Sequence, residues 1–242
     1  MWYYNANMKI LAVIPARGGS KRIPRKNIKN FAGRPIIKYS IDAAKESGIF
    51  DEIMISTDDT EIAEIAKSFG AKVPFLRSKE NSTDTVTTTP VLEEVIMEYK
   101  KLGKEFDYAC CIYPTAVFVT GEKLQKAKQM LMDSGTDSVV LVTRFGFPIQ
   151  RAFRIRKEDG MAEMFWPENY NTRSQDLELA YHDCGQFYFF KVESFLKQKT
   201  LFMKSTMPLE ALESEAQDID NEEDWKIAEI KFNTLHSQDS KH

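Results

Sequence analysis

Apolar positions along the first 143 residues follow two spacings, one typical of strands and one typical of helices. Short apolar runs predict buried strands at residues 9–15, 52–56, 72–75, 108–113 and 138–143. Apolar residues recurring every three or four positions predict helices at 35–47, 58–68, 89–101 and 120–132. Strands that alternate with helices predict an α/β fold whose mostly parallel sheet is covered on both faces.

This alternation stops between residues 146 and 181, a polar stretch that holds Trp166, Tyr170 and Arg173 without clear periodicity. The interruption predicts an inserted arm. A strand at 185–192 and a final helix at 221–232 follow it. Because ligands of such sheets bind beyond the carboxyl ends of the strands, we expect the loops that begin near residues 15, 57, 75 and 113 to converge.

Composition narrows the function classes. The chain has 242 residues, of which 43% are hydrophobic and 29% charged, which is ordinary for a globular protein. No apolar run approaches the length of a membrane helix, and the first residues lack a signal-peptide pattern. Three cysteines form no disulfide or metal spacing, so we expect a cytoplasmic protein. The net charge of −3 argues against a nucleic-acid binder.

The charge is unevenly distributed. Residues 8–41 contain nine lysines and arginines and no acid, whereas residues 210–224 contain eight acids and no base. Within the first stretch, PARGGSKRIPRKN at 15–27 follows the first strand. Glycines let backbone N–H groups point at an anion, and the cations neutralise phosphate. It is neither a P-loop nor a G-x-G-x-x-G fingerprint. We predict a phosphate-binding loop, with a solvated basic loop as the alternative.

The acidic stretch contains Asp218 and Asp220 on either side of Ile219. Alternate residues of an extended segment point the same way, so the two carboxylates suit Mg²⁺, which accepts one or two carboxylates together with waters and phosphates. The alternative is an exposed acidic surface. The polar loop from Arg77 to Thr88 is rich in hydroxyl groups, which can bond to the edge of a base; Asp84 or Thr85 can instead cap a helix.

Several segments together resemble a known family. They are IPARGGSKRIPRKN, STDD at 56–59, LRS and STDT within 76–85, YPT at 113–115 and DID at 218–220. With them the chain resembles the CMP-sialic acid synthetases, cytidylyltransferases that activate nonulosonic and related acidic sugars. FWPENYNTRSQDLE at 165–178 and YHDCGQFY at 181–188 are most similar to the branch that acts on pseudaminic acid.

The resemblance implies one Rossmann-like, three-layer nucleotidyltransferase domain at 8–235 with a dimerisation and sugar-site arm at 146–181. The implied reaction joins CTP to a nonulosonic acid, with pseudaminic acid as the expected sugar. It releases pyrophosphate and supplies surface glycans such as those of flagellin. The resemblance also implies Mg²⁺ and a homodimer. The site residues implied are Arg17, Lys21, Asp218 and Asp220 for catalysis; Asp218 and Asp220 for metal; Arg17, Gly18, Gly19, Ser20, Lys26, Asn27, Arg77 and Thr88 for nucleotide; and Tyr113, Arg173, His182 and Gln186 for sugar.

Alternatives stay open at this point. Legionaminic, N-acetylneuraminic or 3-deoxy-manno-octulosonic acid could replace pseudaminic acid, although Tyr113 stands where sialic acid relatives carry glutamine. Asn27 could contact nucleotide or position the loop, Arg173 could act in the partner's site, and His182 could be structural. A non-catalytic nucleotide sensor on the same fold is a further hypothesis. The acidic pair argues against it, because a sensor has no use for a metal site.

Overall fold

Six strands form the main sheet of the computed structural model, which describes residues 8–237. They are β1 (Ile10–Pro15), β4 (Glu52–Ser56), β5 (Tyr108–Ile112), β6 (Ser138–Arg144), β9 (Tyr181–Lys191) and β10 (Thr206–Ala211). In the order β10-β6-β9-β5-β1-β4, only β9 runs antiparallel to its neighbours. The first residues of β9 therefore lie at the edge where the other strands end.

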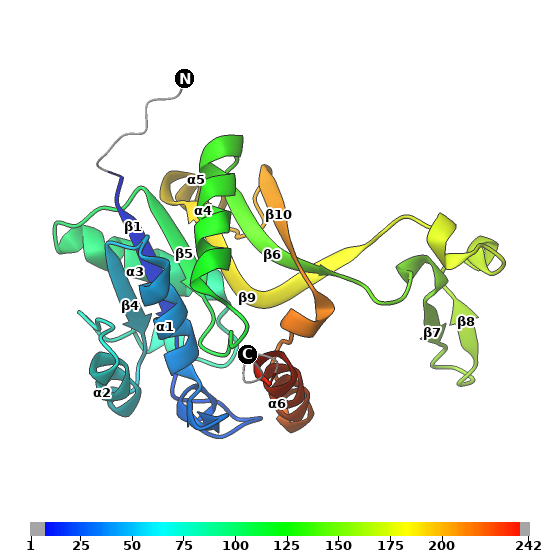
Figure 1. Cartoon of the computed structure of the whole chain (residues 1–242), viewed down its shortest axis with the longest axis horizontal. Coiled ribbons are helices and arrows are strands. Elements are labelled where there is room, and N and C mark those ends of the chain that lie inside the picture. Colours follow the sequence, from blue (N-terminus) through cyan, green and yellow to red (C-terminus); the bar gives the residue numbers. More distant parts are fainter. Residues whose placement is uncertain (1–7, 238–242) are drawn as a thin grey trace.

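Helices cover both faces of this sheet (Figure 1). They are α1 (Ile37–Ser47), α2 (Thr60–Ser68), α3 (Thr88–Lys101), α4 (Gly121–Ser134), α5 (Val192–Gln198) and α6 (Glu222–His236). Within residues 8–237, none is both long and apolar enough to cross a membrane.

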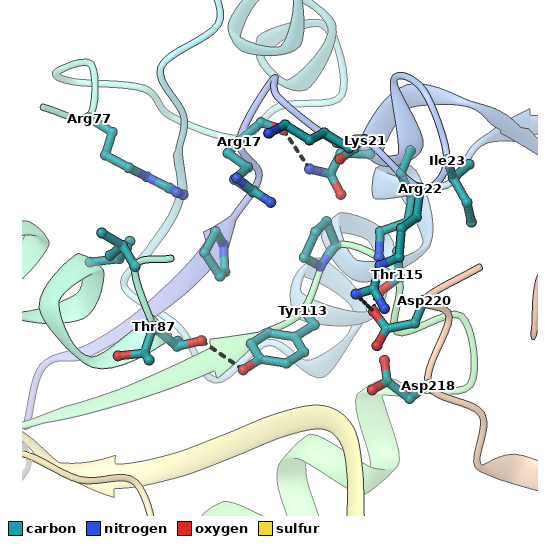
Figure 2. Close-up of a pocket in the computed structure, with 18 residues that line it drawn as sticks. Arg17, Lys21, Arg22, Ile23, Arg77, Thr87, Tyr113, Thr115, Asp218 and Asp220 are labelled. Carbon is teal, nitrogen blue, oxygen red and sulfur yellow. Dashed lines mark hydrogen bonds and ion pairs between the residues drawn. The ribbon is translucent and has the colours of Figure 1, made fainter. Parts of the chain in front are cut away.

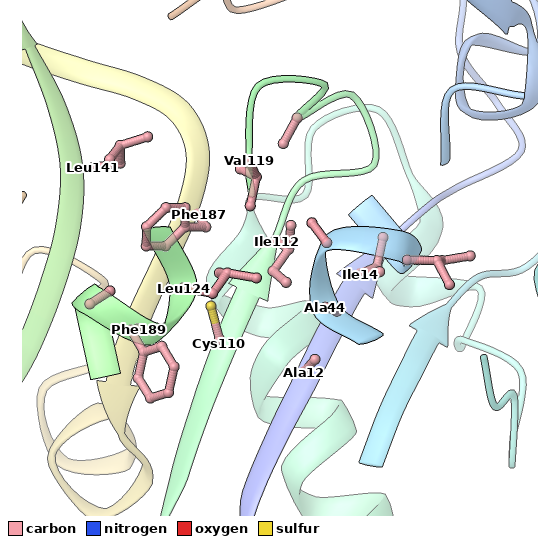
Figure 3. Close-up of a cluster of buried hydrophobic side chains, with 14 of the residues drawn as sticks. Ala12, Ile14, Ala44, Cys110, Ile112, Val119, Leu124, Leu141, Phe187 and Phe189 are labelled. Carbon is pink, nitrogen blue, oxygen red and sulfur yellow. The ribbon is translucent and has the colours of Figure 1, made fainter. Parts of the chain in front are cut away.

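Alternating residues of the strands divide the core between the two faces. Ala12 and Ile14 of β1 pack with α1, α2 and α4, as Figure 3 shows for part of this cluster. Leu11 and Val13 of the same strand pack with α3 and α5. Successive side chains of a strand point to opposite faces, so β1 must be apolar throughout. The predicted three-layer α/β class with a mostly parallel sheet is confirmed.

Helix α6 packs outside these layers and carries the acidic segment to the basic loop. Its Trp225 lies edge-on to Phe31, with ring centroids 5.4 Å apart, and Phe31 belongs to a short hairpin of β2 (Asn30–Phe31) and β3 (Arg34–Pro35). The helix begins with a capping box formed by Asn221 and Asp224. This packing brings residues 218–220 beside the loop that follows β1.

Between β6 and β9 the chain forms an arm that projects from the sheet (Figure 1). Its hairpin pairs β7 (Phe153–Ile155) with β8 (Ala162–Met164) in a separate antiparallel sheet. Large apolar side chains of the arm are exposed, among them Ile155 at 66% and Tyr170 at 64%. An apolar surface of this kind marks an interaction site more often than a monomer surface.

Three features of the fold differ from the sequence-based predictions. The strand predicted at 72–75 is wrong: only Lys72 forms a bridge, with Met54, and Pro74 lacks the N–H group that would extend it. Strand β9 begins at Tyr181, ahead of the predicted residue 185. Strand β10 and helix α5 were not predicted; β10 contains Pro208, which an edge strand tolerates.

Candidate active site

The basic loop after β1 folds back over the end of β4. The Gly18 N–H donates a hydrogen bond to Asp58 at 2.9 Å. A Cβ atom on Gly18 would lie 2.6 Å from Asp59 Oδ2, so the loop can approach this carboxylate only because residue 18 is glycine. Inside the loop, Asn27 is buried and its amide donates to the Arg17 carbonyl oxygen at 2.9 Å. The Asn27 amide nitrogen is thus used in positioning the loop.

Each of the five cations of this loop forms an ion pair with a carboxylate, Arg25 with Asp59 and Glu61 and Lys26 with Asp220. Arg17 Nη1 lies 2.5 Å from Asp84 Oδ1, and Lys21 forms an ion pair with the other oxygen of Asp84. These bonds, from Lys21 first and then Arg17, lower the pKa of Asp84. Arg22 Nη2 lies 2.8 Å from Asp220 Oδ1. The Asp84 carboxylate thus lies between two cations that would suit the oxygens of a phosphate.

The loop, the start of α3 and the end of β5 surround a cavity of about 290 Å³, which we call the basic cavity (Figure 2). The predicted site residues that line it are Arg17, Ser20, Lys21, Lys26, Asn27, Arg77, Thr88, Tyr113, Asp218 and Asp220. Gly18 and Gly19 belong to the loop without lining the cavity. The loops were predicted to converge at the carboxyl ends of the strands. This is confirmed for the loops that follow β1 and β5, and for the segment that holds Arg77.

One end of the basic cavity is lined by Arg77, Thr88 and Tyr113. The Arg77 side chain is tied to the end of β4, because its Nε donates to Ser56 Oγ at 2.9 Å and its Nη2 to the Ser56 carbonyl oxygen. Burial lowers the pKa of Arg77, but a guanidinium remains charged in proteins. Thr88 Oγ1 lies 2.7 Å from the Tyr113 hydroxyl. A planar ring bound here would meet a wall that these bonds hold in place.

Asp218 and Asp220 line another part of the cavity and lie close together (Figure 2). Ile219 between them is fully buried, which directs both carboxylates toward the cavity. The Asp220 N–H donates to Asp224 of α6 at 2.9 Å. Within residues 8–237, no hydrogen bond or ion pair reaches the Asp218 carboxylate. Desolvation by the surrounding protein, and then the charge of Asp220, raise the pKa of Asp218.

Lys26 lies beside this acidic pair. Its Nζ donates to the Ile219 carbonyl oxygen at 2.6 Å and lies 3.8 Å from Asp220 Oδ1. Burial lowers the pKa of Lys26, an effect that the charge of Asp220 opposes. In the described part of the chain, no group of three or more His, Cys, Asp or Glu residues could hold a metal ion. Two adjacent carboxylates, one without a protein partner, suit Mg²⁺ with water and phosphate as its remaining ligands.

A second cavity, of about 480 Å³, adjoins the first and shares Asp218 and Asp220; we call it the acidic cavity. Its other lining residues are Thr143, His182, Asp183, Cys184, Glu213, Ala216, Gln217, Asp224 and Lys231. The predicted site residue His182 thus lies near the acidic pair. Its ring packs against Phe145, with centroids 4.7 Å apart.

Besides Gly18 and Gly19, two predicted site residues line neither cavity. Gln186 is fully buried, and its Nε2 donates to the Glu215 carbonyl oxygen at 2.8 Å. The prediction that it contacts a sugar finds no support, because its place in β9 turns it into the interior. Arg173 lies on the arm, where its Nε is 2.7 Å from Asp176 Oδ2. It can meet a substrate only in another copy of the chain or after a rearrangement.

Sequence reasoning missed residues that hold the site together. Asp58 accepts a hydrogen bond from the loop backbone, Ser56 accepts one from Arg77, and Asp84 forms ion pairs with two loop cations. Tyr188 donates to Asp183 at the edge of the acidic cavity. The segment STDD contains Ser56 and Asp58, and its position after a strand was a usable signal. Asp84 and Asp183 lie in the segments STDT and YHDCGQFY, but neither segment predicts their partners, which are set by packing.

Comparisons with known proteins show which family this chain resembles. The cytidylyltransferase family model matches residues 11–224. The pseudaminic acid cytidylyltransferase of Campylobacter jejuni is 41% identical over 229 residues, 95% of this chain and 98% of the relative. The CMP-N,N'-diacetyllegionaminic acid synthase of Legionella pneumophila is 34% identical, covering 92% and 95%. The solved structure of CMP:2-keto-3-deoxy-manno-octonic acid synthetase with CTP matches with a TM-score of 0.66 at 16% identity, covering 96% and 99%, which shows a shared fold.

Proposed function

Because this chain belongs to the cytidylyltransferase family, we propose that it joins CTP to pseudaminic acid, forming CMP-pseudaminic acid and pyrophosphate. The choice of sugar is supported by the 41% identity with the pseudaminic acid cytidylyltransferase of Campylobacter jejuni over nearly the whole of both chains. Legionaminic acid is the second candidate, because the Legionella pneumophila synthase is 34% identical over a similar length. A reaction that consumes CTP is expected in the cytoplasm, where unpaired cysteines are stable.

In this reaction the anomeric hydroxyl oxygen of the sugar bonds to the α-phosphorus of CTP, and the bond from that phosphorus to pyrophosphate breaks. Alignment and charge neutralisation supply most of the catalysis in such displacements. We assign the triphosphate to Arg17 and Lys21, where it would replace the carboxylate of Asp84. The Lys21 side chain is 80% exposed and can follow the leaving pyrophosphate. Arg17 would stay beside the backbone that Asn27 supports.

We assign Mg²⁺ to Asp218 and Asp220. The assignment is supported by the carboxylate of Asp218, which lacks a hydrogen-bond partner among residues 8–237, and by the shared position of the pair in both cavities. A bound Mg²⁺ would polarise the α-phosphate and favour the ionised hydroxyl of the sugar. Lys26, which contacts the Ile219 carbonyl oxygen, keeps the segment against the basic loop.

We place the sugar in the acidic cavity, with its anomeric carbon near Asp218 and Asp220 and with His182 at its side, while Tyr113 lines the adjoining basic cavity. Lys231 is the lysine that lines this cavity, and its ammonium group already donates to the carbonyl oxygens of Glu213 and Ala216 at 3.0 and 2.8 Å. The sugar carboxylate therefore needs a cation from elsewhere. This need supports a homodimer in which Arg173 on the arm of the partner enters the site.

The exposed apolar side chains of the arm support the same dimer. Phe153, Ile155 and Met161 of the hairpin are 57%, 66% and 59% exposed, and burying them against a second copy would be favourable. Replacing Ile155 with Asp should yield a monomer, as measured by light scattering. A protein that stays dimeric would remove the arm from the interface.

The reaction is tested by pyrophosphate release with CTP and Mg²⁺ across a panel of nonulosonic acids. We expect release with pseudaminic acid and little with the others. Release with legionaminic acid would keep the reaction and change the substrate. No release from any sugar, with CTP binding retained, would favour the non-catalytic sensor.

A further inference from the structure

Asp183 lies at the start of β9, and both oxygens of its carboxylate accept hydrogen bonds from the same strand. The Gly185 N–H donates to Oδ1 at 2.9 Å, and the Tyr188 hydroxyl donates to Oδ2. The residue also lines the acidic cavity. Asp183 thus joins the surface of that cavity to a buried tyrosine and to a turn of the backbone.

The first of these bonds holds a backbone conformation that Asp218 depends on. Gly185 has a φ of +60°, which disfavours other residues. A Cβ atom there would lie 3.1 Å from Cγ of Asp218, so the carboxylate rests against the bare backbone of Gly185. In the same region the pairing of β9 with β6 shifts register between Val140 and Val142. The hydrogen bond between the Asp183 carboxylate and the Gly185 N–H therefore lies within the irregular part of β9.

The second bond reaches the basic cavity. Tyr188 is 3% exposed, and its ring lies edge-on to that of Tyr113, with centroids 5.6 Å apart. The Tyr113 hydroxyl lies 2.7 Å from Thr88 Oγ1. Burial raises the pKa of Tyr113 to about 12 and also raises that of Tyr188, so both hydroxyls keep their protons near neutral pH. The contacts form a continuous path from Asp183 to the wall of the basic cavity.

We propose that Asp183 is a positioning residue that sets the acceptor-sugar side of the site, holding Asp218 through Gly185 and Tyr113 through Tyr188. The inference rests on the proposed function. Small displacements of aligned groups slow a displacement reaction strongly. Among residues 8–237, no hydrogen bond or ion pair joins Asp183 to Arg17, Lys21 or Arg77, and its path to Thr88 runs through two tyrosines. The affinity for CTP should therefore change much less than the kinetics with the sugar.

The test compares Asp183→Ala, Asp183→Asn and Tyr188→Phe with the wild type. For each, CTP binding without sugar is measured by calorimetry, and kcat and KM for the sugar by pyrophosphate release. In Asp183→Ala we expect kcat/KM for the sugar to fall at least about tenfold, with the Kd for CTP within about twofold. Asp183→Asn keeps an acceptor for the Gly185 N–H and should recover most of the loss. Tyr188→Phe should give an intermediate loss.

A matched control is Asp137→Ala at the other end of the β6–β9 pair. The Asp137 carboxylate likewise accepts two hydrogen bonds, both from side chains, namely Ser194 at 2.6 Å and Gln198 at 3.0 Å. Its loss should lower the melting temperature and leave the KM for the sugar unchanged. If Asp183→Ala does not fold, the two milder variants decide the question.

Two results would overturn the inference: sugar kinetics of all the Asp183 and Tyr188 variants within about twofold of the wild type, or a loss of CTP affinity as large as the loss in kcat/KM. The sugar kinetics and the CTP affinity of each variant are compared with those of the wild type, using a sugar that the wild type converts. A wild-type enzyme that converts no sugar would instead refute the proposed function, and the positioning role with it.

Discussion

Replacing Glu52 with glutamine should destabilise the fold while leaving the active site intact. Glu52 begins β4, at the opposite end of the strand from Ser56 and the basic loop. It is only 7% exposed and accepts hydrogen bonds from the Tyr99 hydroxyl at 2.6 Å, from Lys104 at 2.8 Å and from Lys72 at 3.1 Å. One carboxylate therefore joins β4 to α3 and to two surface segments.

The expected loss follows from these bonds. A hydrogen bond to a charged group contributes about 1.5–3 kcal/mol and one between neutral groups about 1 kcal/mol. The bond from Tyr99 should therefore weaken by about 1 kcal/mol. Lys72 and Lys104 are half exposed, and such ion pairs contribute at most about 1 kcal/mol together after screening. The total of about 2 kcal/mol corresponds to a fall in melting temperature of roughly 4–8 °C for a chain of this size.

The loss of stability expected for Glu52→Gln depends on pH. Burial alone would raise the pKa of Glu52, but the hydrogen bonds from Lys104, Tyr99 and Lys72 outweigh it, and the pKa lies below the ordinary value of 4.5. A carboxyl whose folded-state pKa is depressed contributes stability above its unfolded pKa and loses it as pH falls through the folded pKa. The difference between wild type and Glu52→Gln should thus be constant near neutral pH and shrink below pH 4.5.

Urea unfolding at pH 7 and in mild acid measures this difference, with CTP turnover as the readout of the active site. The control is Glu98→Gln, since Glu98 pairs with Lys101 on the surface of α3 at 2.6 Å and should change stability by less than about 0.5 kcal/mol. An unchanged urea midpoint for Glu52→Gln, or a difference that widens in acid, would refute the reasoning.

Further predictions concern the basic loop and the acidic pair. Lys21→Ala should lower turnover by orders of magnitude with folding unchanged, because an oriented charge on a transferring phosphate is worth several kcal/mol; near wild-type turnover would remove Lys21 from the mechanism. Asp220→Asn should raise the Mg²⁺ concentration needed for half-maximal activity, and an unchanged titration would rule out its metal role. Asp84→Asn should tighten CTP binding in calorimetry, because a competing carboxylate leaves Arg17 and Lys21; weaker binding would show that Asp84 organises the loop.

The order of strands and helices up to residue 143 was predictable because it depends on local periodicity. Apolar runs such as 9–15 must be buried wherever they occur. Strand β10 escaped prediction because an edge strand needs few apolar residues and tolerates Pro208. The segment 72–75 has strand-like residues, yet only Lys72 pairs. Whether a strand forms there depends on its neighbour as much as on its own residues.

The candidate site was likewise predictable only in part. The cation-rich loop with two glycines after a buried strand was predictable, as were Asp218 and Asp220 on either side of an apolar residue, because these properties belong to short contiguous segments. Three other features became visible only in the folded chain: Asp84 binds the loop cations, Gln186 turns inward and Asp183 contacts Tyr188. The bonds of Asp84 and the orientation of β9 follow from how distant segments pack, and no local pattern specifies that packing.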